Sequence, residues 1–397
     1  MGIRAAAIWE ANAIVTRLSR QEAEHYRRRV EQAAAAGAPH STCARLAAIE
    51  ARAWLMVGNW RASQDLLRVT LGSDPGPLAD IENRLSAALA AAWQDRPAEA
   101  GAHLERADEL VTGDTHGYLN FPFDTVRSFV SLEAGLPEAA YRAAMAGLSL
   151  PSGVPPDLCE FLVPLASRAL ADQAEAARDA GISETAVLNE LGSLLDRFPD
   201  IVTDPGQSTP LMIIQRSAMR SWYAAEVGRA RRAGRYGELW LHTATLFDEG
   251  GLPWLEMYAW RRASETLLGG GRQTRAEGRH ALRRGYELAC ELQARSTQRE
   301  LEALAQSARA PLASGPQSTV TPSALPGLTP REHEILGYLV AGSTYAEIAN
   351  TLVISEKTVS SHVSNLLRKT HTSSRVELAQ LAHRVAQNTS SPSAREV

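Results

Sequence analysis

Residues 355–369 read SEKTVSSHVSNLLRK, and they contain both lysines of the 397-residue chain, Lys357 and Lys369. Apolar residues recur in this stretch at helical spacing, at Val359, Val363, Leu366 and Leu367. Serine is a favoured N-cap residue, so Ser355 marks the helix start. The stretch predicts an amphipathic helix with one apolar face and a polar face that carries both lysines and Arg368.

Three more helix starts surround this stretch. Thr329-Pro330-Arg331-Glu332 combines an N-cap threonine, a proline at the first helical position and a glutamate three residues after the cap. Thr344 with Glu347, and Ser374 with Glu377, make two further capping boxes. We therefore expect a bundle of four short helices. The brief connection Val353-Ile354 between the second and third is typical of a helix-turn-helix that places its second helix in a DNA major groove.

The expected bundle core is made of apolar residues on the other three helices. These are Ile335, Leu336, Leu339 and Val340, then Ile348, Ala349 and Leu352, and finally Leu378, Leu381 and Ala382.

The motif LTPREHEILGYLVAG…EIANTLVISEKTVSSHVSNLLRKT…SSRVELAQLA resembles the LuxR-type helix-turn-helix domain of bacterial transcription regulators, over about Leu328 to Val385. The resemblance implies that the third helix enters the major groove and that the fourth forms a homodimer contact. The residues that match the groove-facing positions are Lys357, Thr358, Ser360, Ser361, His362, Ser364, Asn365, Arg368 and Lys369. Double-stranded DNA is thus the expected partner.

The sequence departs from this family at several positions. Ser360 and Ser364 stand where relatives often carry Lys or Arg, which predicts weaker attraction to phosphate. Thr370-His371 replaces the usual Leu-Gly after the third helix, which puts the following turn and the dimer contact in question. Tyr345 replaces a frequent Asn, and we interpret this as a tolerated surface change.

The charge of the chain is nearly balanced. It has 41 basic and 45 acidic residues, for a net charge of −4. No polybasic coat or membrane-surface patch is indicated, so DNA binding would have to be local. Lys357, Arg368 and Lys369 supply that local charge, and we expect each subunit of a dimer to bind weakly.

A linker precedes the C-terminal module. Residues 310–327 (APLASGPQSTVTPSALPG) carry no charge and four prolines, a composition that favours a flexible or semi-extended segment. We therefore expect three parts: residues 1–309, a linker at 310–327, and a DNA-binding domain at 328–390.

Residues 1–309 are expected to be helical throughout, because alanine is abundant and β-branched residues are sparse. Helical stretches break at similar places, and most intervals between them are 37 to 40 residues, which approaches the period of helix-turn-helix solenoid repeats. The middle section, around Ala180-Gly181-Ile182, fits this period poorly. The breaks are Gly58-Asn59-Trp60, Gln94-Asp95-Arg96-Pro97, Ala134-Gly135-Leu136-Pro137, Ala233-Gly234-Arg235-Tyr236 and Gly269-Gly270-Gly271-Arg272. The fold class expected for the chain is all-α: a tetratricopeptide-like α-α superhelix followed by the four-helix LuxR-type domain.

Several chemistries have no supporting motif. Neither lysine follows a glycine-rich loop, so no P-loop is present. Cys43, Cys159 and Cys290 form no CxxC pair, and the ten histidines show no metal-binding spacing. No long apolar segment suggests a membrane span or a signal peptide. We expect no catalysis, cofactor or metal, and a soluble cytoplasmic protein.

The aromatic residues of the repeat region allow two interpretations. Seven tryptophans could line a ligand groove, but their helical spacing favours core packing: Trp54, Trp60, Trp93, Trp222, Trp240, Trp254 and Trp260.

The region before the linker, Leu252 to Leu304 above all, resembles the helical-repeat region of the large ATP-binding LuxR-type regulators. Their ATPase module has no counterpart here, so the chain is expected to be either a naturally short member or the C-terminal part of a longer regulator. The leading hypothesis is a DNA-binding transcription regulator controlled by a protein or small-molecule effector on the repeats. The alternative is a helical-repeat interaction scaffold with weak or vestigial DNA binding.

Overall fold

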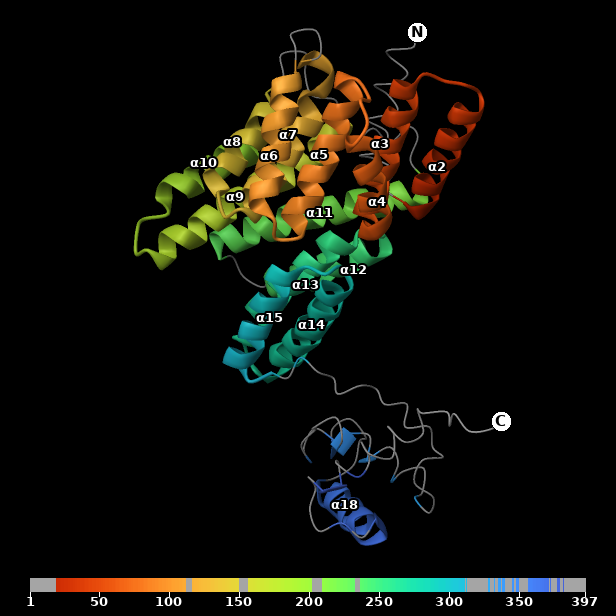
Figure 1. Cartoon of the computed structure of the whole chain (residues 1–397). Coiled ribbons are helices and arrows are strands. Elements are labelled where there is room, and N and C mark those ends of the chain that lie inside the picture. The colour runs from red at the N-terminus through yellow and green to blue at the C-terminus, as the bar shows by residue number, and fades with distance from the viewer. Residues whose placement is uncertain are drawn as a thin grey trace, which may run out of the picture. The chain divides into compact units, whose positions relative to one another are not determined.

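The computed structural model describes residues 19–111, 116–149, 156–201, 209–232 and 236–310, and a discontinuous set after them. That set comprises 312, 328, 332, 335–336, 338–339, 345, 348–349, 356–370, 372, 377–378 and 381. Side chains are not described for 116–122, 156–159, 272–273 and 361. The chain divides into two compact units, Met1–Ala310 and Pro311–Val397 (Figure 1). Most of the predicted linker, namely residue 311 and residues 313–327, lies outside the described residues.

The first unit is built of helices, and its described residues include no strand. Its helices are α2 (Arg20–Ala35), α3 (His40–Met56), α4 (Trp60–Leu71), α5 (Pro77–Trp93), α6 (Pro97–Leu110), α7 (His116–Glu133), α8 (Pro137–Gly147), α9 (Pro156–Asp179), α10 (Thr185–Arg197), α11 (Pro210–Arg231), α12 (Tyr236–Glu249), α13 (Pro253–Leu268), α14 (Arg272–Glu291) and α15 (Arg295–Ala308). The prediction of an all-helical chain is confirmed for the part that the structure describes.

The helices pack as successive pairs. From α3 to α10, the first helix of each pair contacts its partner and also the first helix of the next pair, as in α3 with α5 and α7 with α9. The second helix of a pair also contacts the first helix of the next pair, as in α4 with α5 and α8 with α9. Because each pair shares its apolar face with two neighbours, a continuous core forms along the stack.

The predicted breaks fall between helices. Residues 58–59, 94–96, 134–136 and 269–271 separate α3 from α4, α5 from α6, α7 from α8 and α13 from α14, and the last residue of each predicted break begins the next helix. Residues 233–235 lie outside the described residues, between α11 and α12. The spacing of Gly and Pro therefore predicted the helix boundaries correctly.

A buried acid recurs in the first helix of the pairs, and the sequence analysis did not detect it. The residues and their exposed fractions are Glu50 4%, Glu82 4%, Asp124 8%, Glu160 4% and Glu256 3%. Buried carboxylates need partners. Trp54 Nε1 donates to Glu50 at 3.0 Å, and Arg216 Nε of α11 donates to Glu160 at 2.8 Å. The acids thus fix side chains within a helix and between pairs. A recurring apolar-acid dipeptide, Ile49-Glu50, Ile81-Glu82 and Leu255-Glu256, was the available signal.

The tryptophans confirm the expectation of core packing. All seven are at most 8% exposed. Trp93 of α5 and Trp254 of α13 stack with ring centroids 4.9 Å apart, and Trp60 of α4 lies 5.6 Å from Trp254. Because α13 follows α5 by more than 150 residues, these rings join two distant parts of the stack.

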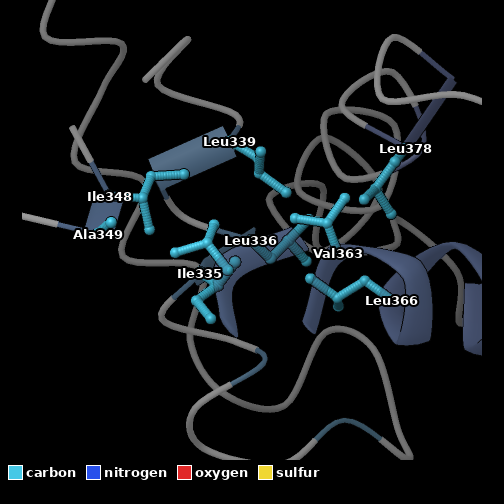
Figure 2. Packing of buried hydrophobic residues seen from close by; sticks show 9 residues of the cluster. Ile335, Leu336, Leu339, Ile348, Ala349, Val363, Leu366 and Leu378 are labelled. Carbon is cyan, nitrogen blue, oxygen red and sulfur yellow. The ribbon is translucent and has the colours of Figure 1, made fainter. Parts of the chain in front are cut away.

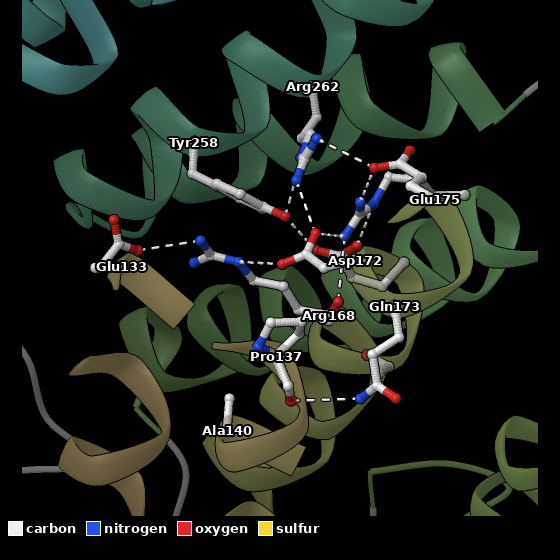
Figure 3. Close-up of polar contacts among 12 residues, drawn as sticks. Glu133, Pro137, Ala140, Arg168, Asp172, Gln173, Glu175, Tyr258 and Arg262 are labelled. Carbon is white, nitrogen blue, oxygen red and sulfur yellow. Dashed lines mark hydrogen bonds and ion pairs between the residues drawn. The ribbon is translucent and has the colours of Figure 1, made fainter. Parts of the chain in front are cut away.

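An ion cluster ties α9, α11 and α13 together (Figure 3). Asp172 Oδ1 of α9 accepts from Arg229 Nη2 at 2.7 Å and from Arg262 Nη2 at 3.0 Å. Burial alone would raise the pKa of Asp172, but the charges of Arg229, Arg262 and Arg168 outweigh it and lower the pKa to about 2. Asp172 therefore stays ionised at neutral pH.

Candidate nucleic-acid interface

The second unit is organised around α18 (Glu356–Thr370), the predicted third helix. Val359, Val363 and Leu366 of α18 are at most 1% exposed, and Leu367 is half-buried. The spacing of i, i+4 and i+7 places the three buried side chains on one face. The apolar face predicted from the sequence is thus the face that packs inward.

A small apolar core covers that face (Figure 2). It comprises Ile335, Leu336, Leu339, Ile348, Ala349, Val359, Val363, Leu366 and Leu378, each at most 4% exposed. These residues come from all four predicted helices, so helices far apart in the motif share one core. The expected core members Val340, Leu352 and Ala382 lie outside the described residues, and Leu381 is half-buried.

Polar residues occupy the exposed side of α18. Lys357, Ser364 and Arg368 follow one another at helical spacing and point away from the buried face, since the helix turns by about 100° per residue. Lys357 and Arg368 are separated by roughly 16 Å along the axis at ~1.5 Å per residue. The helix therefore presents a polar stripe with a cation near each end.

Lys369, one of the predicted contact residues, pairs with a buried acid. Lys369 Nζ lies 2.7 Å from Oε2 of Glu332, and Glu332 is 5% exposed. Helical geometry places Lys369 on the flank of α18, closer to the core than Arg368. The charge of Lys369 is thus largely used to balance a buried carboxylate.

Local hydrogen bonds shape the rest of the helix. The hydroxyl of Ser364 donates to the carbonyl oxygen of Ser360 at 2.9 Å, so its proton is directed at the helix backbone. At the C-terminus, Thr370 Oγ1 donates to Leu366 O at 2.7 Å, and the amide of Thr372 donates to Leu367 O at 3.0 Å. These bonds engage the carbonyl groups of Leu366 and Leu367 in the last turn of α18.

The structure brings all nine predicted DNA contacts onto α18. Seven are exposed, namely Lys357, Thr358, Ser360, Ser364, Asn365, Arg368 and Lys369. His362 is half-buried, and the side chain of Ser361 lies outside the described residues. The cap residues Thr329, Thr344, Ser355 and Ser374, and the turn Val353-Ile354, also lie outside them.

Sequence reasoning missed the role of Glu332. We interpreted it as the glutamate of a capping box with Thr329, which lies outside the described residues, and the structure adds a contact between its carboxylate and Lys369. No local pattern in the sequence marks this pair, because the two residues are 37 positions apart.

Other kinds of site find no support in the described residues. No group of three or more His, Cys, Asp or Glu among them is arranged to hold a metal ion. No helix in the described part of the chain has the length and apolarity to cross a membrane.

Residues 326–382 match the family described as "Bacterial regulatory proteins, luxR family". They therefore form a LuxR-type helix-turn-helix DNA-binding domain, homologous to those of transcriptional regulators.

Three proteins illustrate the similarity. The transcriptional regulatory protein LiaR of Bacillus subtilis (strain 168) is 45% identical over 64 residues, which are 16% of this chain and 30% of LiaR. The uncharacterized response regulatory protein YgeK of Escherichia coli (strain K12) is 45% identical over 58 residues, 15% of this chain and 40% of YgeK. The spore germination protein GerE of Bacillus subtilis (strain 168) is 52% identical over 44 residues, 11% of this chain and 60% of GerE.

The chain thus covers between 30% and 60% of the length of these three relatives. No solved structure matches it.

Proposed function

We propose that the chain is a sequence-specific transcription regulator that inserts α18 into the major groove of DNA and is controlled through its helical unit. The observation that carries the proposal is the exposed polar stripe of α18, set on an apolar core within a LuxR-type domain. A helix with one buried face and one polar face can approach base edges without disturbing its own fold.

The residues of α18 would make different kinds of DNA contact according to their chemistry. Lys357 and Arg368, near the two ends of the stripe, contact phosphates and set the register. Ser360, Ser361, Ser364 and Asn365 lie between them, and the Asn365 amide has the donor and acceptor that pair with adenine. Thr358 is near the helix N-terminus, whose amides favour phosphate.

Two predicted contacts take smaller roles in this proposal. Lys369 holds α18 against the core through Glu332 and adds little charge toward DNA. His362, half-buried on the flank of the helix, would contact DNA only at its edge.

The protein would act as a dimer. A single α18 has few cations and binds weakly, whereas two copies joined by the C-terminal helix double the phosphate contacts. Two-fold pairing would read an inverted repeat with half-sites about 10 base pairs apart. The stacked helix pairs, arranged as a tetratricopeptide-like superhelix, would receive an effector and control this pairing.

The test is binding of the full chain to DNA selected from a random pool. A double Lys357→Ala, Arg368→Ala variant should bind the selected operator at least tenfold more weakly, because it loses a cation near each end of the stripe. The control is Arg309→Ala, an exposed arginine after α15. Equal binding by the double variant and the wild type would rule out this face of α18.

A second candidate function is a helical-repeat scaffold with vestigial DNA affinity. It is favoured by the short hydroxyls at Ser360 and Ser364, and by the use of the Lys369 charge inside the fold. Genome-wide occupancy separates the two functions. A few sharp peaks on inverted repeats support the regulator, whereas their absence beside a stable protein partner supports the scaffold.

A further inference from the structure

Basic charge in the first unit is concentrated in α14, the helix before α15. Residues 1–271 contain 26 basic and 34 acidic residues, whereas residues 272–286 contain five arginines and one glutamate. Most of the unit therefore repels a polyanion, and the first three quarters of α14 attract one. A local group of arginines along one helix is the electrostatic signature of a nucleic-acid contact.

Three of these arginines form one line along α14, called the arginine stripe below. Arg275, Arg279 and Arg283 are spaced four residues apart, so they share one side of the helix over about 12 Å of its axis. Arg275 is exposed, and Arg279 and Arg283 are half-buried. Like charges four residues apart destabilise a helix. An anionic partner along the stripe would offset that repulsion.

Close packing fixes the direction in which the stripe points. α14 packs against α13 and α15 (Figure 1). A Cβ atom at Gly278 would lie 2.9 Å from the backbone nitrogen of Leu268, and one at Gly285 would also meet α13. Arg279 and Arg283 lie about 100° or more around the helix from both glycines. These two arginines therefore lie away from the contact with α13.

The stripe retains positive charge for a partner. Among the described residues, no carboxylate forms an ion pair with Arg275 or Arg283. Nε of Arg275 donates to the carbonyl oxygen of Leu268 at 3.1 Å, which anchors the side chain and leaves its two Nη groups for another acceptor. Arg284, which lies off the stripe, pairs with Glu256 at 3.3 Å.

We propose that the arginine stripe of α14 binds the phosphate backbone of duplex DNA beside the operator that α18 binds. The proposal rests on the DNA-binding function proposed above. Residues 311–327 join the two units and can span at most about 60 Å, so DNA held by α18 stays at a high local concentration around α14. Contacts between arginine and phosphate carry no sequence information. The stripe would therefore lengthen the bound DNA without choosing the site.

Two duplexes test the proposal with the full chain. One ends at the selected operator, and the other extends about 20 base pairs, or roughly 70 Å, beyond each end of it. Fluorescence anisotropy at several salt concentrations gives the affinity for each. The wild type should bind the long duplex about tenfold more tightly at low salt, with a salt slope steeper by about 2, because each phosphate contact contributes ~0.9.

Variants of the stripe test its location. Arg275→Gln with Arg283→Gln should lose the preference for the long duplex and keep the wild-type affinity for the short one. Arg275→Lys with Arg283→Lys keeps the charge and should keep the preference. The matched control, Arg61→Gln with Arg142→Gln, removes the same charge from exposed positions of α4 and α8 and should also keep it. Far-ultraviolet circular dichroism checks that each variant is folded.

Each outcome decides the proposal. Equal affinity of the wild type for the two duplexes, or an unchanged preference in the glutamine variant of the stripe, overturns it. Loss of the preference in the lysine variant or in the control also overturns it, since charge at the stripe would not be the cause. Binding to phosphatidylglycerol vesicles without a preference for the long duplex would assign the stripe to a lipid surface instead.

The short duplex separates this proposal from the proposed function. Lys357→Ala with Arg368→Ala should weaken binding to the short duplex, whereas the glutamine variant of the stripe should not. The two proposals therefore fail on different measurements.

Discussion

The ammonium group of Lys369 lies 2.7 Å from the buried carboxylate of Glu332, and this ion pair fastens α18 to the first predicted helix of the domain. One of the two lysines in the chain therefore has a structural role. The other, Lys357, is on the exposed side of the same helix. The two lysines should consequently respond differently to mutation.

Replacing Lys369 should loosen α18. Lys369→Ala leaves the carboxylate of Glu332 buried without its cation, which costs about 1–3 kcal/mol. Hydrogen exchange of the full chain, followed by mass spectrometry, should become faster in residues 356–370. Arg368→Ala, one residue earlier and exposed, should leave exchange unchanged. Partial recovery of protection in Lys369→Met with Glu332→Gln would support the pairing, and equal exchange in Lys369→Ala and Arg368→Ala would contradict it.

The same helix predicts a pattern in the salt dependence of DNA binding. Lys357→Ala and Arg368→Ala should each lower the slope of log affinity against log salt by about 1, because each removes one phosphate contact. Lys369→Ala should lower it less, since its charge is balanced by Glu332. Fluorescence anisotropy on the selected operator at four salt concentrations gives the slopes. A larger loss of slope for Lys369→Ala than for Lys357→Ala would show that Lys369 contacts phosphate.

The Asp172 cluster predicts an acid-sensitive first unit. The folded pKa of Asp172, about 2, lies below its ordinary value of 3.8, so the ionised carboxylate stabilises the fold above about pH 4. This contribution, about 2 kcal/mol, is lost as the pH falls through 2. Urea unfolding of Asp172→Asn, followed by tryptophan fluorescence, should show a deficit at pH 7 that shrinks toward pH 2.5.

The matched control for that measurement is Asp65→Asn, because Asp65 and its partner Arg68 are both largely exposed. It should change the stability little at either pH. A constant deficit for Asp172→Asn between pH 7 and pH 2.5 would argue against the arginine cluster as its origin.

Gly58 predicts a close approach between distant helices. Its φ is +83°, and a Cβ atom there would lie 2.8 Å from Cγ of Pro253, the first residue of α13. Gly37 also has a positive φ, +71°, but a Cβ there meets nothing within 4 Å. Gly37→Ala should therefore cost about 1–2 kcal/mol from the backbone alone. Gly58→Ala should cost roughly 1–3 kcal/mol more, since the contact is overpacked. Thermal unfolding measures the loss of stability in both variants. Equal losses would mean that Pro253 moves aside at no cost in free energy.

Much of the architecture was predictable because it follows from local periodicity. The face of α18 with Val359 and Val363 needed only helical spacing, and the helix ends at Trp93 and Pro97 needed only turn-forming residues and proline at a helix start. Burial of the tryptophans followed from the same spacing. Such sequence signals span fewer than ten residues, so they can be interpreted without knowing which other helices pack nearby.

The contacts between distant helices were not predictable in the same way. Trp93 and Trp254 looked like two separate core residues, and nothing in their surroundings marked them as a stacked pair. Nothing in the sequence near Asp172 of α9 marked it as the acid that joins Arg229 and Arg262 from two other helices.

The sequence by itself determined the DNA-binding motif, the polar stripe of α18 and the positions of the helix breaks, because each depends on side chains within a few turns of one helix. The tertiary structure alone decided that Lys369 balances Glu332, that α13 returns to α5, and that Asp172 joins Arg229 and Arg262. The physical reason is that the packing of one helix pair determines where the next pair lies. The helices that finally meet depend on how every helix pair between them packs, rather than on any local pattern.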